Sequence, residues 1–326
     1  MLRIIAILGV IILHYNNPDM GEGLCLVTNG SINQYILLAL ETLFACSVNV
    51  FIMISAYFLS TTYKRSVVKI FELVVQVSLF RIAAFLLGKL SSGSKITIVD
   101  VGISILPVNY FVILYGVLYF ISPYINRSTE GMTKLQMKKM VYVVFVLFSI
   151  WPFGVDLLEK AIGYQLNGIS TIGVGGSQAG YSIVNFVLIY IVAAYLRKYP
   201  ITIENKKLIL AGVGIFSLNY VATLIQNQLW NGNIIWWNYD NPFLIVFAAL
   251  VVMLFLRVNI HNSMINEISK ATFTCYLIHI MFLQYIKVDH FVNRIPLIMI
   301  VHIIVVAIGI YIVSYVVYKI YYVCSN

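Results

Sequence analysis

The chain has 326 residues, of which 61% are hydrophobic and 10% are charged, and its formal net charge is +9. Soluble globular domains are nearer half apolar and a quarter charged, so this composition excludes that class and predicts a polytopic membrane protein. The basic residues fall between apolar segments, which membrane topology explains without a nucleic-acid partner. The four cysteines show no paired spacing, so we expect neither a disulfide framework nor a metal site.

Ten apolar segments are long enough to cross about 30 Å of hydrocarbon as helices of about 20 residues. They cover residues 1–17, 34–60, 67–88, 98–122, 140–158, 181–197, 208–227, 241–257, 271–288 and 296–322. We therefore expect an all-α fold of about ten transmembrane helices, forming one domain over residues 1–326 with no appended soluble domain. Fifteen of the 21 Lys and Arg residues fall on the side that holds both termini and five on the other. The positive-inside rule then predicts that both termini are cytoplasmic and that the protein lies in the cell membrane.

The first apolar segment contains two ionisable residues, Arg3 and His14. Eleven residues make about three helical turns, so both side chains lie on nearly one face, about 16 Å apart along the axis. Ionisable groups inside a spanning helix are costly and usually mark a functional path, and His suits general-base chemistry. The alternative is an Arg that reaches lipid phosphate and a His that hydrogen-bonds a neighbouring helix.

The second segment adds Glu41 and Asn49. Glu41 lies at a depth comparable with that of His14, where a carboxylate can orient an imidazole as part of a catalytic base. It is equally consistent with a residue at the membrane rim. Asn49 can hydrogen-bond a pantetheine arm or hold the first helix in place, whereas the nearby Ser55 and Ala56 are more typical of close helix packing.

Basic residues follow the second segment, at Lys64 and Arg65, and Arg81 lies within the third. Arg and Lys at one cavity mouth suit the phosphates of an acyl-CoA, so these three are candidate donor-binding residues. Membrane topology alone also explains the positive charge at Lys64 and Arg65, because cytoplasmic connections are rich in Lys and Arg. Arg81 is harder to explain that way, because it lies well inside an apolar segment.

Candidate acceptor contacts lie on the side opposite to the basic residues. They combine aromatic rings with amides and a carboxylate, a combination that suits a sugar. They are Tyr181, Trp236, Trp237, Asn238 and Asp240. Aromatic side chains at an interface are also ordinary membrane anchors. His279 is a second His within an apolar segment, and we assign it to the substrate site. Whether it takes part in catalysis or only braces the core is open from the sequence.

Five motifs, in order, resemble the membrane acyltransferase family 3. They are Arg3 with His14, Asn49-Val-Phe51 with Ile54-Ser-Ala-Tyr-Phe58, Leu106-Pro107 through Ser122-Pro123, Gly180-Tyr181-Ser182, and Tyr276-Leu-Ile-His279. The resemblance implies transfer of an acyl group, typically acetyl, from cytoplasmic acyl-CoA to carbohydrate hydroxyls outside. It implies acetyl-CoA as the donor, with Arg3 near its phosphates and His14 as the base.

Three functional classes remain open from the sequence. The first is an O-acetyltransferase of a surface polysaccharide or its lipid-linked precursor. The second is a transporter or flippase that moves such a precursor unmodified, and the third is a non-catalytic partner of the assembly machinery. The shared face of Arg3 and His14 and the five motifs favour the acyltransferase.

Overall fold

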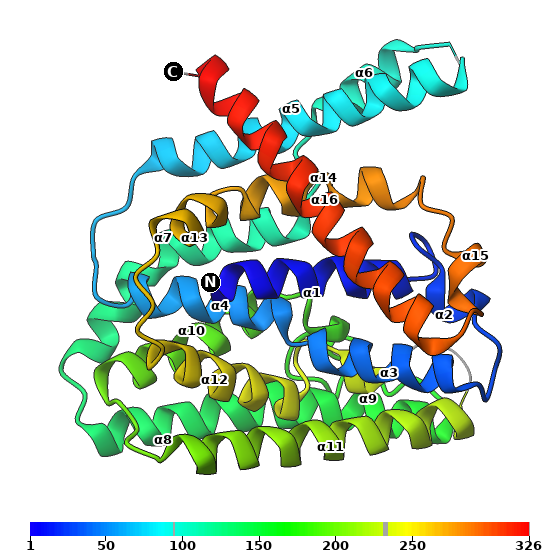
Figure 1. Ribbon diagram of the computed structural model, residues 1–326. Helices are drawn as coiled ribbons and strands as arrows, with labels where there is room; N and C mark the ends of the chain where they lie inside the picture. The colour runs from blue at the N-terminus through cyan, green and yellow to red at the C-terminus, as the bar shows by residue number, and fades with distance from the viewer. Residues whose placement is uncertain (94, 231–233, 326) are drawn as a thin grey trace.

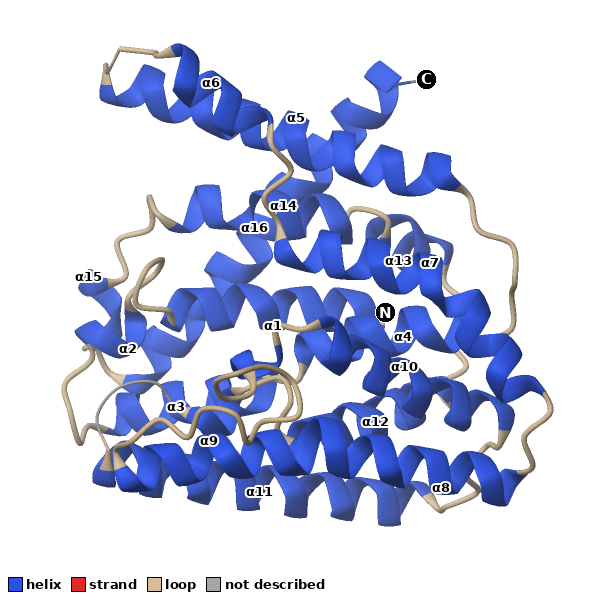
Figure 2. Ribbon diagram, turned by 180° about the vertical axis from the view of Figure 1, so that it is seen from behind, coloured by secondary structure: helices blue, strands red, loops and turns tan. Residues whose placement is uncertain are grey.

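The computed structural model describes residues 1–93, 95–230 and 234–325, and within these ranges the secondary structure is entirely helical (Figures 1 and 2). The first half contains α1 (Leu2–Asn16), α2 (Gly23–Leu26), α3 (Ile32–Phe44), α4 (Ser47–Leu59), α5 (Val67–Ser92), α6 (Ile98–Ile105), α7 (Tyr110–Glu130), α8 (Lys134–Phe145), the π-helix η1 (Val146–Ile150) and α9 (Trp151–Ile162). The second half contains η2 (Gln178–Gly180), α10 (Ile183–Lys198), α11 (Asn205–Leu229), η3 (Ile235–Trp237), α12 (Pro242–Leu256), α13 (Ser263–Ser269), α14 (Thr272–Leu283), α15 (Asp289–Val292) and α16 (Pro296–Ser325).

Each of the ten predicted apolar segments falls on one of these helices or on a broken pair of them. Within the described residues, six helical stretches are long and apolar enough to cross a membrane, and the bent pair of α6 and α7 makes a possible seventh. α1 and α14 are shorter apolar helices. The protein is therefore all-α and multi-pass, whereas the count of ten crossings and the cytoplasmic termini stay predictions.

α1 runs through the middle of the bundle, with α5 and α6 on one side of it and α8 and α11 on the other (Figure 1). It packs against α3, α4, α14 and α16, which explains why its side chains are apolar all round. Gly9 permits the closest of these contacts. A Cβ at this position would lie 2.6 Å from the hydroxyl of Ser47 and would also overlap the ring of Phe44.

A second core forms where α4 packs against α10 and α12. Ala56 is fully buried on α4, and its small side chain permits this close helix packing. One large apolar cluster thus surrounds α4, and another surrounds α1 together with α14 and α16. α1, which carries Arg3 and His14, and α4, which carries Asn49, therefore lie within the two cores.

Asn126 of α7 joins three helices at one end of the bundle. Its amide nitrogen donates to the carbonyls of Leu59 and Thr62, at 2.9 and 2.8 Å, where the chain leaves α4. Its amide oxygen accepts from the hydroxyl of Tyr190 on α10, at 2.7 Å. Because Asn126 is 3% exposed, water cannot replace these bonds.

We expect Asn126→Ala to destabilise the protein, because it leaves buried polar groups without partners. Such a loss costs about 1–3 kcal/mol for each group that stays unsatisfied. Thermal unfolding in detergent measures the effect. The control is Ser128→Ala, an exposed position on the same helix whose hydroxyl bonds only the carbonyl of Ile125. Equal unfolding temperatures for both variants would contradict this role for Asn126.

Candidate active site

The two buried histidines of the sequence motifs meet at the centre of the bundle. His14 on α1 and His279 on α14 are joined by a hydrogen bond of 2.5 Å between Nδ1 of His14 and Nε2 of His279. Their rings stack nearly parallel, with centroids 4.7 Å apart. His279 is 0% exposed and His14 is partly exposed. Two side chains that are 265 residues apart in the chain therefore form one unit.

The hydrogen bonds of this pair determine which nitrogen atoms carry protons. Nδ1 of His279 lies 3.0 Å from the carbonyl oxygen of Cys275, and a carbonyl only accepts, so this nitrogen is the donor. In neutral His279, Nε2 is then an acceptor, and it takes its hydrogen bond from Nδ1 of His14. Neutral His14 is left with an unprotonated Nε2, which is the atom that a general base requires.

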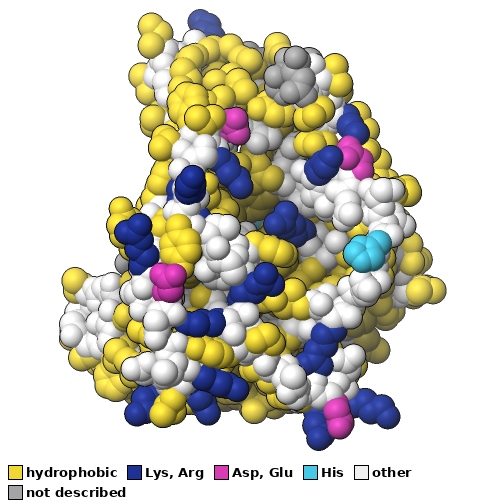
Figure 3. All heavy atoms as spheres, turned by 90° about the vertical axis from the view of Figure 1, so that its left-hand side faces the viewer, with side chains coloured by type: hydrophobic (Ala, Val, Ile, Leu, Met, Phe, Trp, Pro, Cys, Tyr) yellow, Lys and Arg dark blue, Asp and Glu magenta, His cyan; other side chains and the backbone are white. Residues whose placement is uncertain are grey.

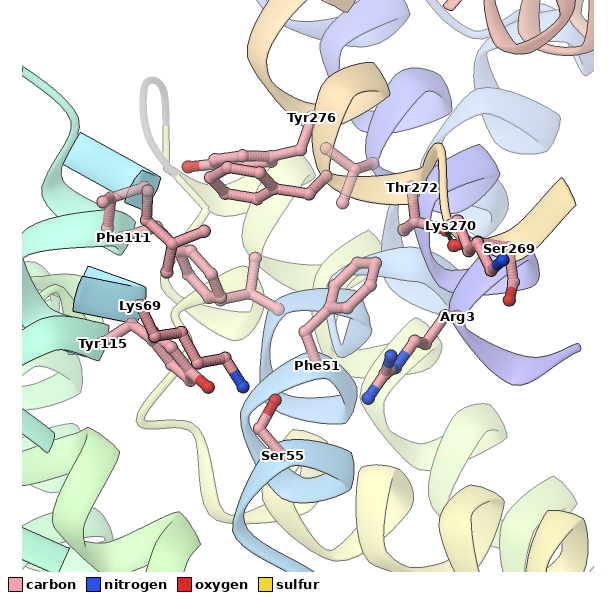
Figure 4. Close-up of a pocket in the computed structure, with 15 residues that line it drawn as sticks. Arg3, Phe51, Ser55, Lys69, Phe111, Tyr115, Ser269, Lys270, Thr272 and Tyr276 are labelled. Atoms are coloured by element: carbon pink, nitrogen blue, oxygen red, sulfur yellow. Dashed lines mark hydrogen bonds between the residues drawn. The ribbon is translucent and has the colours of Figure 1, made fainter. Parts of the chain in front are cut away.

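A cavity of about 290 Å³ has Arg3 in its lining (Figure 4). Neither histidine lines it, but two of the lining residues lie close to the pair. Its inner end includes Val10, one helical turn before His14, and Tyr276, whose ring centroid is 6.0 Å from that of His279. Its other lining residues include three cations, four further aromatic rings and three serine or threonine hydroxyls: Arg3, Lys69, Lys270, Phe51, Phe111, Tyr115, Phe273, Ser55, Ser269 and Thr272. The cavity thus combines positive charge with largely apolar walls, and its inner end lies close to the histidines.

Arg3 is one of the residues that line this cavity. Its guanidinium points into the space beside Ser55 and Phe51 (Figure 4). It lies about 16 Å from His14 along the helix axis, by the rise of eleven residues. The two residues therefore share one path without direct contact, which favours a binding role for Arg3 over a part in the proton transfer.

The predicted donor-binding cations Arg65 and Arg81 are instead bonded within the protein. Arg65 donates to the carbonyl of Tyr119 at 3.0 Å and to the hydroxyl of Ser122 at 2.7 and 2.9 Å, which pins the α4–α5 connection to α7. Arg81 donates to the carbonyl of Val108 at 2.9 Å, just after α6. Neither residue lines the cavity.

The remaining predicted donor-binding residues, Lys64 and Asn49, also lie outside the cavity lining. Lys64 is exposed. Asn49 is 0% exposed, and its amide donates to the carbonyl of Tyr239 at 2.9 Å. The cations that do line the cavity with Arg3 are Lys69 and Lys270, which the sequence reasoning did not select. Lys69 belongs to the same basic turn as Lys64, and Lys270 directly precedes α14.

Among the described residues, Glu41 forms its side-chain hydrogen bond with Asn16 and not with His14. Its carboxylate accepts a hydrogen bond of 2.8 Å from the amide of Asn16, two residues after His14 on α1. His14 instead has His279 as its partner. The orienting group that the sequence reasoning sought in Glu41 is thus provided by His279, and a catalytic role for Glu41 itself stays a prediction.

The predicted acceptor residues near α12 brace the protein from within. Trp236 packs between Phe153 and Phe243, with ring centroids 5.2 and 5.8 Å away. Trp237 donates through its indole nitrogen to the hydroxyl of Thr42 at 3.2 Å. These contacts do not favour an open sugar platform. Residues 231–233 of the same stretch lie outside the described residues.

Asn238 bonds to α9 itself, and Asp240 bonds to the loop that follows α9. The amide of Asn238 donates to Asp156 at 3.2 Å, and the hydroxyl of Ser177 lies 3.1 Å from Oδ1 of Asp240. Asp240 is 0% exposed. The loop reaches this position because Gly180 adopts a positive φ of 79°, and a Cβ there would collide with the backbone of Asp240.

Tyr181 is the predicted acceptor residue that is most open to the outside, at 46% exposed. Its ring lies 4.6 Å from that of Tyr110 and 5.0 Å from that of Tyr239. Phe111 and Tyr276 follow, 5.3 Å apart, and both also line the cavity. We refer to Tyr110, Phe111, Tyr181, Tyr239 and Tyr276 as the aromatic layer.

Comparison with known families gives one match that covers nearly the whole chain. The model of the acyltransferase domain of acyltransferase family 3 matches residues 1–319. No curated protein and no solved structure matches the chain. The family match agrees with the resemblance that the five motifs carry.

A small ionic cluster fixes the cavity lining at α13. Glu267 bonds Lys270 at 2.7 Å and Lys319 of α16 at 2.5 Å. Hydrogen bonds from Lys270 and then Lys319 lower the pKa of Glu267 from 4.5 to about 2. The cluster ties the segment that carries Lys270 to the last helix.

We expect this cluster to stabilise the fold in a pH-dependent manner. Because the pKa of Glu267 is lower in the folded state, its contribution is complete above about pH 4.5 and is lost as the pH falls through about 2. Glu267→Gln should therefore lower the unfolding temperature near neutral pH, and the difference from wild type should shrink below pH 4.5. The control is Glu204→Gln, whose exposed partner Lys207 is 3.9 Å away. A difference that is independent of pH would contradict this assignment.

Proposed function

The chain belongs to acyltransferase family 3, and from this premise we propose that it is a membrane O-acetyltransferase. Acetyl-CoA is the proposed donor, and a hydroxyl of a surface polysaccharide or its lipid-linked precursor is the proposed acceptor. The observation that carries the proposal is the bonded pair of His14 and His279 beside the inner end of a cavity lined by cations.

In the proposed reaction, Nε2 of His14 accepts the proton of the acceptor hydroxyl. The hydroxyl oxygen then bonds to the carbonyl carbon of the thioester, and the C–S bond breaks. The departing sulfur takes the proton from the imidazolium of His14, so coenzyme A leaves as a free thiol. His279 keeps the His14 ring in the required tautomer throughout, as a positioning residue.

The charge of the cavity supports an anionic donor that enters from the side of Arg3. Figure 3 shows this face of the molecule, where Lys and Arg side chains gather around a hollow. Arg3, Lys69 and Lys270 line the cavity from three different helices or helix connections. Cations of this kind suit phosphate groups, while the apolar interior suits the pantetheine arm.

The acceptor, by the same reasoning, approaches from the opposite side. Within the aromatic layer, the ring centroid of Tyr276 lies 6.0 Å from that of His279, and Tyr181 is 46% exposed. Aromatic faces are suitable surfaces for the C–H face of a sugar. We therefore retain Tyr181 as the proposed acceptor contact and regard the residues from Trp236 to Asp240 as its structural support.

A single genetic experiment tests the reaction and its acceptor together. The gene is deleted, and the cell-surface polysaccharide is examined for base-labile acetyl groups by proton NMR. Loss of O-acetyl groups from an otherwise normal polymer, restored by the wild-type gene, is the expected result. Loss of the polymer itself would instead indicate transport of a precursor.

We expect His14→Ala to abolish acetyl transfer while the protein remains inserted and folded. A general base contributes about 10²–10⁴-fold to a rate, so complementation with this variant should not restore the acetyl groups. His302→Ala is the matched control, because His302 is a histidine of α16 that bonds Tyr15 at 2.9 Å, away from the cavity. Full acetylation with His14→Ala would overturn the assignment.

His279 gives a second, graded prediction. His279→Leu removes the acceptor for Nδ1 of His14, so kcat should fall by about 10²-fold or more, since general-base catalysis is lost. His279→Gln retains an amide oxygen that can accept this hydrogen bond, and its kcat should fall less. The KM for acetyl-CoA should stay near the wild-type value in both. An equal fall in kcat in the two variants would show that the hydrogen bond between His14 and His279 does not contribute to catalysis.

A further inference from the structure

A second cavity adjoins the first on the side of Arg3. It measures about 380 Å³, and Arg3 and Ser269 line both cavities. Its other walls come from the N-terminus, the end of α4, the end of α12 and α13. Ligand sites commonly measure roughly 300–1,000 Å³, so the two cavities together provide the space that one long ligand requires.

The geometry of the first cavity determines which part of a donor it can hold. Its inner end lies one turn of helix from His14, so the reactive thioester belongs there. Arg3 stands where the two cavities meet, and its planar guanidinium suits a diphosphate. The part of an acyl-CoA beyond the diphosphate is an adenosine that carries a further phosphate, and the second cavity is the adjoining space.

The lining of the second cavity suits a flat heteroaromatic base. Tyr57 and Phe58 contribute two rings whose centroids are 5.6 Å apart, and Phe255 contributes a third. Phe58 is 58% exposed, so one face of its ring is open to a ligand. Bases stack on aromatic side chains of this kind. The amide of Asn266 lines the same space, and an amide can bond the N6 and N7 edge of adenine.

A further cation lies beside this cavity. The guanidinium of Arg197 is 4.7 Å from the centroid of the Tyr57 ring, and its Nη1 donates to the hydroxyl of Tyr57 at 3.1 Å. Arg197 is exposed. It therefore holds the Tyr57 ring in place and adds positive charge where a phosphorylated ribose requires it.

We propose that the second cavity binds the adenosine end of the donor, with Phe58 and Asn266 as its specificity residues and Arg3 at the junction. This inference rests on the proposed function and extends it, because it assigns the two ends of one donor to two cavities. Phe58 and Asn266 thereby select a nucleotide-bearing thioester over a shorter one.

The test compares two donors in the purified, full-length protein. One is acetyl-CoA, and the other is S-acetylpantetheine, which carries the same thioester without diphosphate or nucleotide. Removal of a stacking ring costs about 1–3 kcal/mol, so Phe58→Ala should raise the KM for acetyl-CoA about tenfold or more. It should leave the KM for S-acetylpantetheine within about twofold, and Asn266→Ala should act in the same direction.

The matched control is Phe71→Ala, an exposed phenylalanine on α5 that lines neither cavity and should change neither KM. A direct binding arm uses adenosine 3′,5′-bisphosphate and calorimetry, with weaker binding expected for Phe58→Ala and Asn266→Ala. If both variants use acetyl-CoA as wild type does, or lose both donors equally, the nucleotide site is wrong. If the bisphosphate binds wild type and not the variants, but no acetyl transfer occurs, the site stands and the proposed reaction fails.

Discussion

The hydrogen bond between His14 and His279 is the interaction on which the rest of the arrangement depends. In a water-poor interior, a polar ring without a partner is costly, and each of these histidines satisfies the other. The carbonyl of Cys275 fixes the proton at one end of the pair. This one-way sequence of donors leaves a single free nitrogen on His14. The packing of α1 against α14 thus fixes the tautomer of His14 as well as the position of its ring.

The packing of α1 explains how this state is maintained. Gly9 permits close contact with α3 and α4, because a Cβ at this position would overlap Phe44 and Ser47. Arg3 and His14 are therefore held at the two ends of one rigid rod. Both cavities have Arg3 of this helix in their lining, so one helix joins the cationic part of the cavities to the base.

Much of the helical framework could be predicted from the sequence, because long apolar segments report burial in a membrane directly. The shared face of Arg3 and His14 also follows from helical spacing. The pairing of His14 with His279 does not, since contacts between distant segments depend on packing that periodicity does not encode. The sequence also does not distinguish the basic residues after α4. Arg65 hydrogen-bonds the carbonyl of Tyr119 and the hydroxyl of Ser122, whereas Lys69 lines the cavity. Trp236 to Asp240 have the chemistry of a sugar site, but the same groups serve equally well to satisfy buried loop backbone.

The aromatic layer has a consequence for the membrane itself. A catalyst that receives one substrate from each face risks forming a continuous wet path, and such a path would let protons and ions cross. The ring centroid of Tyr181 lies 4.6 Å from that of Tyr110 and 5.0 Å from that of Tyr239, and Phe111 and Tyr276 line the cavity. In the proposed reaction, which takes one substrate from each face, packed aromatic rings at this place disfavour such a path, because they leave little room for water.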